Sequence, residues 1–336
     1  MKTFFKKSFF LFLLIIFASS FSAPSLQAAT ELKLALLAPE GSTWAKVMHD
    51  WDKELTQLTQ GRVKFKFYFG GVMGDERDVI RKMRYGQVHL SAFTGLGLGV
   101  VNPEMRILEL PFLAQTYEEI DKISTAFQPK LEAGFKKRGF TLLAWNETGF
   151  VHVFSNKPVN SLEDMKGMKW WAWDGDPLVE ALYKEVGITP IPLALPDVYT
   201  SLQTNLVDAV YSTPLAVLAL QWSSRVKYVS DVKLTHASGG ILIANDAYKM
   251  LSSADRSILE KTAQKYSHIL LTRIRNDNEK SYDVLKEQGL KFVSISPVEL
   301  KRIQEKCIHV WDELAGKLYS KEMLAELKAF LQTLRK

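Results

Sequence analysis

Apolar residues follow strand spacing and helical spacing in turn along the first part of the chain. A continuous apolar run from Leu32 to Ala38 predicts a buried strand, and Ser42 or Thr43 begins a segment with helical spacing. From Val63 to Phe69 every second residue is a valine or phenylalanine, which predicts a half-buried strand. A helix near residues 75–85 and a strand at 88–93 follow. This order predicts an α/β layer with a largely parallel sheet.

A second α/β series follows a helix predicted near 117–137. Its predicted elements are strands at 140–145, 151–155, 207–211 and 240–244, and helices at 177–186 and 197–205. From Ser253, helical spacing continues without Gly or Pro to Gln288, about 50 Å at 1.5 Å per residue. Such a helix is long enough to span two lobes. We therefore predict one lobe from 29–150 and 240–278 and a second lobe from 151–239 and 279–336.

The N-terminus has the pattern of a secretory signal peptide. Lys2, Lys6 and Lys7 precede an apolar run, and Leu26-Gln27-Ala28 fits a small-residue cleavage site. We expect cleavage after Ala28 and release into the periplasm. Removing residues 1–28 lowers the formal net charge from +6 to about +3, so no basic surface for nucleic acid is expected.

Residues that could build a metal or catalytic centre are scattered. No two of the six histidines have the i, i+4 spacing of a helical metal site, and neither a serine nucleophile elbow nor a phosphate-binding loop is present. The only cysteine, Cys307, is expected to be a small buried residue on a C-terminal helix. Gly95, Gly97 and Gly99 form a glycine run that predicts a tight turn. We expect no metal, no cofactor and no enzymatic activity.

Tryptophan is unusually dense in Lys169-Trp170-Trp171-Ala172-Trp173-Asp174. If this segment is a strand, Trp171 and Trp173 project to one face and Trp170 to the other. The segment could pack a core on both faces. It could also line a pocket for an apolar or aromatic ligand.

A series of short motifs, in order, resembles the solute-binding proteins of tripartite ATP-independent periplasmic (TRAP) transporters, the DctP family. The motifs are Gly61-Arg62-Val63, Gly74-Asp75-Glu76-Arg77, Leu110-Pro111-Phe112, Ser155-Asn156-Lys157-Pro158-Val159, Asp164-Met165-Lys166-Gly167-Met168-Lys169, Asp197-Val198-Tyr199-Thr200-Ser201-Leu202-Gln203 and Val207-Asp208. The resemblance implies a two-lobed α/β periplasmic binding fold with crossing hinge strands and a long lobe-spanning helix. It also implies a small-molecule ligand in the interlobe cleft and a membrane permease as partner. We expect a monomer.

Two positions depart from that family. Where the family has arginines that bind a substrate carboxylate, this chain has Trp171 and Val151. The resemblance implies further pocket residues, and the chain adds neighbouring ones: Leu37, Ala38, Asp75, Thr94, Phe150, Trp173, Asp174, Leu195, Tyr211, Ser212 and Thr213. A buried carboxylate without a cation is costly, so we expect an apolar or aromatic ligand and no arginine within its reach.

Four alternatives stay open. Asp75, Glu147, Asp174 and Asp176 could make the cleft acidic, so that a cation binds against Trp171 or Trp173. Carboxylate binding could persist through Lys169 or Arg77. The protein could be an enzyme, for which no nucleophile, base or metal cluster is evident, or a sensory or scaffold protein that binds a membrane receptor.

Overall fold

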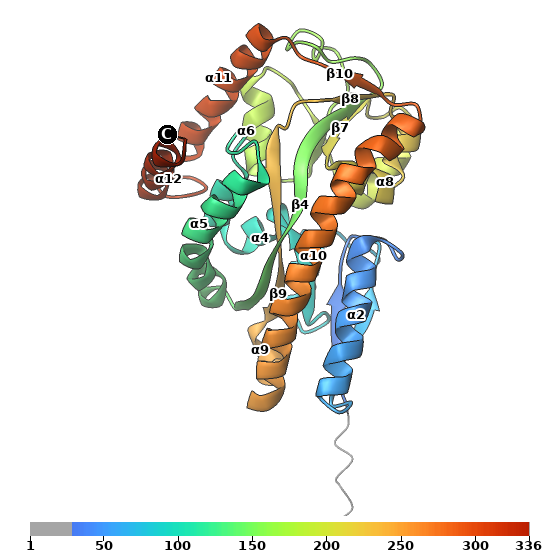
Figure 1. Cartoon of the computed structure of the whole chain (residues 1–336), viewed down its shortest axis with the longest axis vertical. Coiled ribbons are helices and arrows are strands. Elements are labelled where there is room, and N and C mark those ends of the chain that lie inside the picture. Colours follow the sequence, from blue (N-terminus) through green and yellow to red (C-terminus); the bar gives the residue numbers. More distant parts are fainter. Residues whose placement is uncertain (1–28, 336) are drawn as a thin grey trace, which may run out of the picture.

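Two long strands, β4 (Phe140–Ser155) and β9 (Thr235–Ala244), cross the middle of the molecule in the computed structural model, which describes residues 29–335 (Figure 1). They pair antiparallel, from Phe140 opposite Ala244 to Val151 opposite Thr235. The proposed signal peptide lies outside the described residues. We call β4 and β9 the crossing strands because strands of both predicted lobes pair with them.

The remaining strands join the crossing strands on two sides. β1 (Thr30–Ala35), β2 (Val63–Tyr68) and β3 (Leu90–Thr94) form a parallel group that reaches β9 through β3. On the other side, β7 (Ala209–Ser212) and β8 (Tyr228–Ser230) pair with the end of β4, and β10 (Lys291–Val293) pairs with β8. A separate parallel pair is formed by β5 (Trp171–Trp173) and β6 (Ile191–Leu193). The fold is thus a two-lobed α/β fold, as expected, with a mixed rather than purely parallel sheet.

Helices cover both groups of strands (Figure 1). The α-helices are α2 (Thr43–Leu58), α3 (Glu76–Arg84), α4 (Gly95–Val101), α5 (Tyr117–Lys137), α6 (Pro177–Glu185), α7 (Val198–Gln203), α8 (Pro214–Ala219), α9 (Asn245–Lys249), α10 (Ser253–Glu287), α11 (Pro297–Leu314) and α12 (Lys321–Leu334). Short 3-10 helices are η1 (Pro103–Glu109), η2 (Leu195–Asp197) and η3 (Trp222–Arg225). No helix of the described part is both long and apolar enough to cross a membrane.

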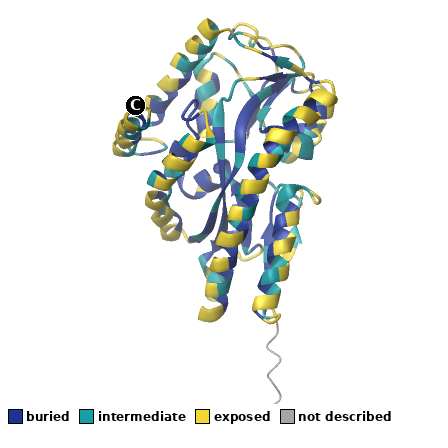
Figure 2. Cartoon of the chain, viewed as in Figure 1, coloured by how far each residue is buried: buried dark blue, intermediate teal, exposed yellow. Residues whose placement is uncertain are grey.

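The predicted long helix is present as α10. The hydroxyl of Ser252 accepts a hydrogen bond from the Asp255 backbone and so caps the N-terminus of α10. The helix then runs for 35 residues. It packs against β4, α2 and α8, and Figure 2 shows buried and exposed residues alternating along it. Because it contacts elements of both predicted lobes, α10 connects the two sides of the molecule.

The predicted break in β4 is absent. Strands were expected at 140–145 and 151–155, but the polar residues between them continue the strand. The β4–β9 register shifts between Leu142 and Ala144 and again between Glu147 and Gly149, which marks bulges. Buried partners hydrogen-bond to part of the polar middle of the strand: the amide of Asn278 in α10 donates to the Thr148 carbonyl at 2.8 Å.

The C-terminal helices α11 and α12 pack against residues of the first predicted lobe. Phe330 of α12 lies edge-on to Phe127 of α5, with ring centroids 5.7 Å apart, and Glu326 pairs with Lys130 of α5. The indole of Trp311 in α11 donates to the Pro111 carbonyl at 3.1 Å. The division into lobes at the stated residues remains a proposal, and these contacts cross its boundary.

Candidate ligand-binding site

A cavity of about 570 Å³ lies between the two groups of strands. Its wall is formed by the loop after β1, the junction of β3 with α4, residues of η1, the crossing strands, β5 and the start of α8. Most of the lining side chains are apolar. This is the size and character of a site for a small molecule.

Most of the residues expected from the sequence line this cavity. They are Leu37, Ala38, Thr94, Val151, Trp171, Trp173, Leu195, Tyr211, Ser212 and Thr213. They come from both predicted lobes and meet only in the folded chain. That they contact a ligand stays a prediction.

Three expected residues are not part of the wall. Phe150 points to the other face of β4 from Val151 and packs on Tyr117 and His236, with ring centroids 5.0 and 5.3 Å away. Asp174 is exposed in the turn after β5. Asp75 caps α3 and accepts a hydrogen bond from the Glu76 backbone at 2.8 Å.

The two bases proposed as substitutes for the family arginines also lie outside the wall. Lys169 donates to the Asn205 carbonyl at 2.9 Å on the surface, and Arg77 donates to the Gly175 carbonyl. Of the four acidic residues proposed to attract a cation, only Asp176 lines the cavity. The Glu147 carboxylate is instead paired with Arg275 at 2.9 Å, beside the crossing strands.

Aromatic rings form one side of the cavity. Trp171 is stacked on Tyr211, with centroids 4.7 Å apart and planes 18° apart, and its indole donates to the Leu193 carbonyl at 3.1 Å. Trp173 lies beside it at 5.9 Å. Trp170 belongs to a different buried cluster, with Ala172 and Tyr183. The alternation expected for these tryptophans is therefore present.

The turn after β5 contacts the opposite side of the cavity at several points. The Trp173 indole donates to Asp75 at 2.7 Å, Arg77 contacts Gly175, and Arg106 pairs with Asp176 at 3.0 Å. We call residues 173–176 the closure segment. These contacts join the turn after β5 to α3 and η1.

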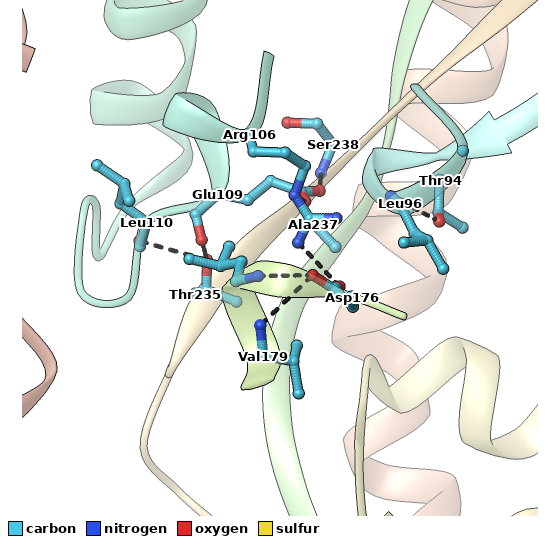
Figure 3. A network of polar contacts seen from close by, with 12 residues as sticks. Thr94, Leu96, Arg106, Glu109, Leu110, Asp176, Val179, Thr235, Ala237 and Ser238 are labelled. Carbon is cyan, nitrogen blue, oxygen red and sulfur yellow. Dashed lines mark hydrogen bonds and ion pairs between the residues drawn. The ribbon is translucent and has the colours of Figure 1, made fainter. Parts of the chain in front are cut away.

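One residue of the cavity wall was not predicted from the sequence: Arg106. Arg106 of η1 forms ion pairs with Asp176 and with Glu109, the latter at 3.2 Å, and Figure 3 shows these side chains converging. We call these three residues the cleft cluster. All three side chains are at most 7% exposed. The expectation that no arginine lies within reach of a ligand in the cavity is therefore wrong.

The hydrogen bonds of the cleft cluster are unevenly distributed. Glu109 accepts from the Ser238 backbone at 2.7 Å, and Asp176 caps α6 by accepting from the Leu178 backbone at 3.0 Å. Nε of Arg106 makes no hydrogen bond to any of residues 29–335, although it lies 3.2 Å from Glu109. Only Nη2 of this guanidinium donates to a side chain of the described residues, Asp176. Burial disfavours the charge of Arg106, but the two carboxylates outweigh it and raise its pKa.

The glycine run explains how these charges fit. It forms the short helix α4 rather than the expected turn. A Cβ on Gly95 would lie 1.9 Å from the Glu109 carboxylate, and one on Gly99 would lie 2.6 Å from the Arg106 side chain. Glycines at alternate positions thus make room for buried ionised groups. This spacing was the signal in the sequence that could have pointed to Arg106.

A further buried carboxylate, Glu76, reaches the same wall. It accepts hydrogen bonds from the Thr94 backbone and the Gly97 backbone, each at 2.6 Å. Burial raises the pKa of Glu76 to about 8, despite these bonds. Its structural role is to fix the junction of β3 with α4.

Cys307 is buried on α11, as expected, and also lines the cavity. Burial raises the pKa of its thiol to about 12, so it is not a nucleophile at neutral pH. Within residues 29–335, no group of three or more His, Cys, Asp or Glu side chains is placed to hold a metal ion.

Comparison with known proteins gives one consistent result. The family model of bacterial extracellular solute-binding proteins, family 7 (DctP), matches residues 34–318. The sialic acid-binding periplasmic protein SiaP of Vibrio cholerae is 24% identical over 280 residues, covering 80% of this chain and 84% of the relative. The C4-dicarboxylate-binding periplasmic protein DctP of Rhodobacter capsulatus is 21% identical over 311 residues, covering 92% and 93%.

The fold agrees with these matches. The crystal structure of the sugar acid-binding protein DctPAm of Advenella mimigardefordensis with galactonate superposes with a TM-score of 0.84 at 19% identity, covering 89% of this chain and 96% of that one. Relatives and structural neighbours are binding proteins of transporters, and this chain is likewise a binding protein and not an enzyme. The chain belongs to the DctP family of periplasmic solute-binding proteins of TRAP transporters.

Proposed function

We propose that this solute-binding protein captures a neutral, apolar or aromatic small molecule in the cavity and delivers it to the TRAP membrane permease. The observation that carries the proposal is the aromatic wall formed by Trp171 with Tyr211 and Trp173. Trp171 stands where the family arginine would bind a carboxylate, and Val151 stands where a second would. A ring stacked against Trp171 gains about 0.5 to 1.5 kcal/mol beyond its burial.

The charges around the cavity support a neutral solute. The positive charge of Arg106 is already paired with Glu109 and Asp176, and Glu76 lies nearby. A carboxylate ligand would add a negative charge beside a guanidinium that is already paired with two carboxyl groups. In a buried site, such an addition costs several kcal/mol unless a carboxyl group takes up a proton.

The closure segment supports a capture mechanism. Its contacts with Asp75, Arg77 and Arg106 form only when β5 lies against α3 and η1. A solute that contacts both sides adds to these contacts and shifts an open arrangement toward the closed one. We further propose cleavage after Ala28 and a monomeric periplasmic form.

A second candidate is a carboxylate-binding protein that uses Arg106 in place of the two family arginines. Two observations favour it. Nη1 of Arg106 has no hydrogen-bond acceptor among the described residues, and the relatives named above bind acids, sialic acid and C4-dicarboxylates among them. This candidate requires Glu109 or Asp176 to be displaced or protonated when the acid binds.

The test is native mass spectrometry of protein purified from the periplasm, followed by calorimetry. A co-purifying neutral apolar molecule, and no binding of C4-dicarboxylates, sialic acid or 2-oxo acids, is the expected result. Micromolar binding of one of these acids by the unmodified protein would reject the proposal. Loss of that binding in Arg106→Met, with a circular dichroism spectrum that shows the variant to be folded, would then establish the second candidate.

Matched variants connect binding to the aromatic wall. Trp171→Leu and Trp51→Leu each remove a fully buried indole, but only Trp171 lines the cavity. Both should lower stability, whereas only Trp171→Leu should weaken binding of the co-purified molecule, by about tenfold or more. In the reverse direction, Trp171→Arg combined with Val151→Arg should introduce binding of a carboxylate. Equal weakening by both leucine variants would show that the wall does not contact the solute.

A further inference from the structure

The cavity continues beyond the aromatic wall, on the other face of β5. A second set of lining residues comes from α6, α11 and the segments that precede β5 and α11. These residues are Leu162, Val179, Val186, Ile295, Ile303 and Cys307. We call this part the second chamber.

The two parts meet beside the closure segment. Asp176 of the cleft cluster is the cap of α6 and accepts a hydrogen bond from the Val179 backbone at 3.4 Å (Figure 3). Leu178 and Val179, in the first turn of that helix, also line the cavity. Trp171 faces the cleft and its neighbour Trp170 faces the second chamber, and both line the same cavity. The available space is therefore elongated, and it passes the Arg106–Asp176 ion pair.

The second chamber offers almost no hydrogen bonds. Its polar side chains are already used: the Tyr183 hydroxyl donates to the Trp171 carbonyl at 2.8 Å, and the Trp170 indole donates to the Met165 carbonyl at 2.8 Å. A polar solute entering it would lose its bonds to water without replacement. An aliphatic chain makes no hydrogen bonds to water and therefore loses none when it enters the second chamber.

We propose that the solute is an elongated molecule with one neutral oxygen-bearing end at Arg106 and an apolar chain in the second chamber. This inference rests on the proposed function and specifies the solute class. The polar end is an acceptor such as a hydroxyl or carbonyl oxygen, because Nη1 of Arg106 can donate while its charge is balanced by Glu109 and Asp176. The chain is apolar because the walls around it are.

The test uses straight-chain primary alcohols from 1-butanol to 1-dodecanol, with indole as a compact probe for the aromatic wall. Binding is measured by tryptophan fluorescence and calorimetry. Each added methylene that enters the second chamber should tighten binding about fourfold, until the chamber is filled. Indole should bind independently of the chamber.

A pair of neighbouring substitutions on α11 separates the chamber from the cleft. Cys307→Phe fills the chamber, whereas Ile308→Phe adds the same ring at a position that is 41% exposed. We expect Cys307→Phe to weaken 1-dodecanol binding at least tenfold and to leave 1-butanol and indole unchanged. Ile308→Phe should change none of them. If Cys307→Phe does not fold, Val179→Phe fills the chamber from α6.

The outcomes distinguish the two proposals. If affinity is independent of chain length, or Cys307→Phe does not weaken 1-dodecanol binding, the elongated solute is rejected, while indole binding would leave the proposed function standing. If neither indole nor any alcohol binds and the protein binds an organic acid instead, both proposals fail.

Discussion

Two arginines of this protein each face two carboxylates, one of them buried and the other partly buried, but they differ in how many of their nitrogens donate hydrogen bonds. At the crossing strands, Arg275 donates to both oxygens of Glu147, each at 2.9 Å, and to both oxygens of Asp121, at 2.6 and 2.9 Å. His236 lies 3.2 Å from Glu147. We call these four residues the crossing cluster. In the cleft cluster, Arg106 has one well-formed side-chain hydrogen bond, to Asp176.

The difference indicates separate roles. The crossing cluster joins α10 and α5 to β4, against which both helices pack, and all three nitrogens of Arg275 donate hydrogen bonds. The cleft cluster joins η1 to the closure segment across the cavity and retains donor capacity. An arginine whose nitrogens all donate hydrogen bonds stabilises the contact between the elements that it joins. An arginine beside a cavity that has a nitrogen without an acceptor can donate to a ligand.

The largest expected difference between the clusters is in stability. Arg106→Met leaves Glu109 and Asp176 buried without a cation, which should lower the free energy of unfolding by about 3 to 5 kcal/mol. Arg275→Met should cost less, about 1 to 3 kcal/mol, because Glu147 keeps His236 and Asp121 is 56% exposed. Urea denaturation at pH 7 measures both.

A control tests the cause. Adding Glu109→Gln and Asp176→Asn to Arg106→Met removes the unpaired charges and should recover part of the loss. A larger loss for Arg275→Met than for Arg106→Met would contradict the assignment of the cleft cluster as the more buried one.

The second expected difference is in pH dependence. Burial raises the pKa of Glu76 in the cleft to about 8, above its value in the unfolded chain. The folded state therefore holds this proton more tightly, and the contribution of Glu76 to stability falls as pH rises from about 4.5 to about 8. Glu76→Gln should flatten this decline.

Glu147 in the crossing cluster should behave in the opposite way. Burial acts to raise its pKa, but the neighbouring His236 and the hydrogen-bonded Arg275 outweigh burial and lower it. Its contribution is present above its unfolded pKa and is lost as pH falls through the folded value. Glu147→Gln should therefore reduce the acid sensitivity of unfolding. If both variants changed the pH profile in the same direction, the contrast between cleft and crossing strands would be rejected.

The smallest expected effect concerns the closure segment. Trp173→Phe removes the indole that donates to Asp75 across the cavity, which should cost about 1 kcal/mol of the closed arrangement. Small-angle scattering should then show a larger radius of gyration. Trp145→Phe is the control, because its indole donates to Glu132 outside the cavity at 3.3 Å. An equal increase in both variants would mean that the indole of Trp173 does not hold the lobes closed.

The sequence by itself determined the elements and the family of this protein. Ser42, Asp75 and Ser252 each begin a helix as their position before an apolar periodic segment predicts, and the uninterrupted spacing after Ser253 gives the 35-residue α10. Local spacing and capping are properties of neighbouring residues, so they can be read without the fold. The ordered motifs identified the family because each motif is also a short run of neighbouring residues.

The tertiary structure alone decided the composition of the cavity. Arg106, Glu109 and Asp176 are separated by up to 70 residues, and only the packing of η1 against the closure segment brings them together. Phe150, Asp174, Arg77 and Lys169, which the sequence made candidates, lie outside the wall in the folded chain. The direction of a side chain on a strand can be inferred from alternation. The pairing of buried charges cannot, because a charged side chain can be buried only where the fold brings a partner of opposite charge to it, and that partner can lie far away in the sequence.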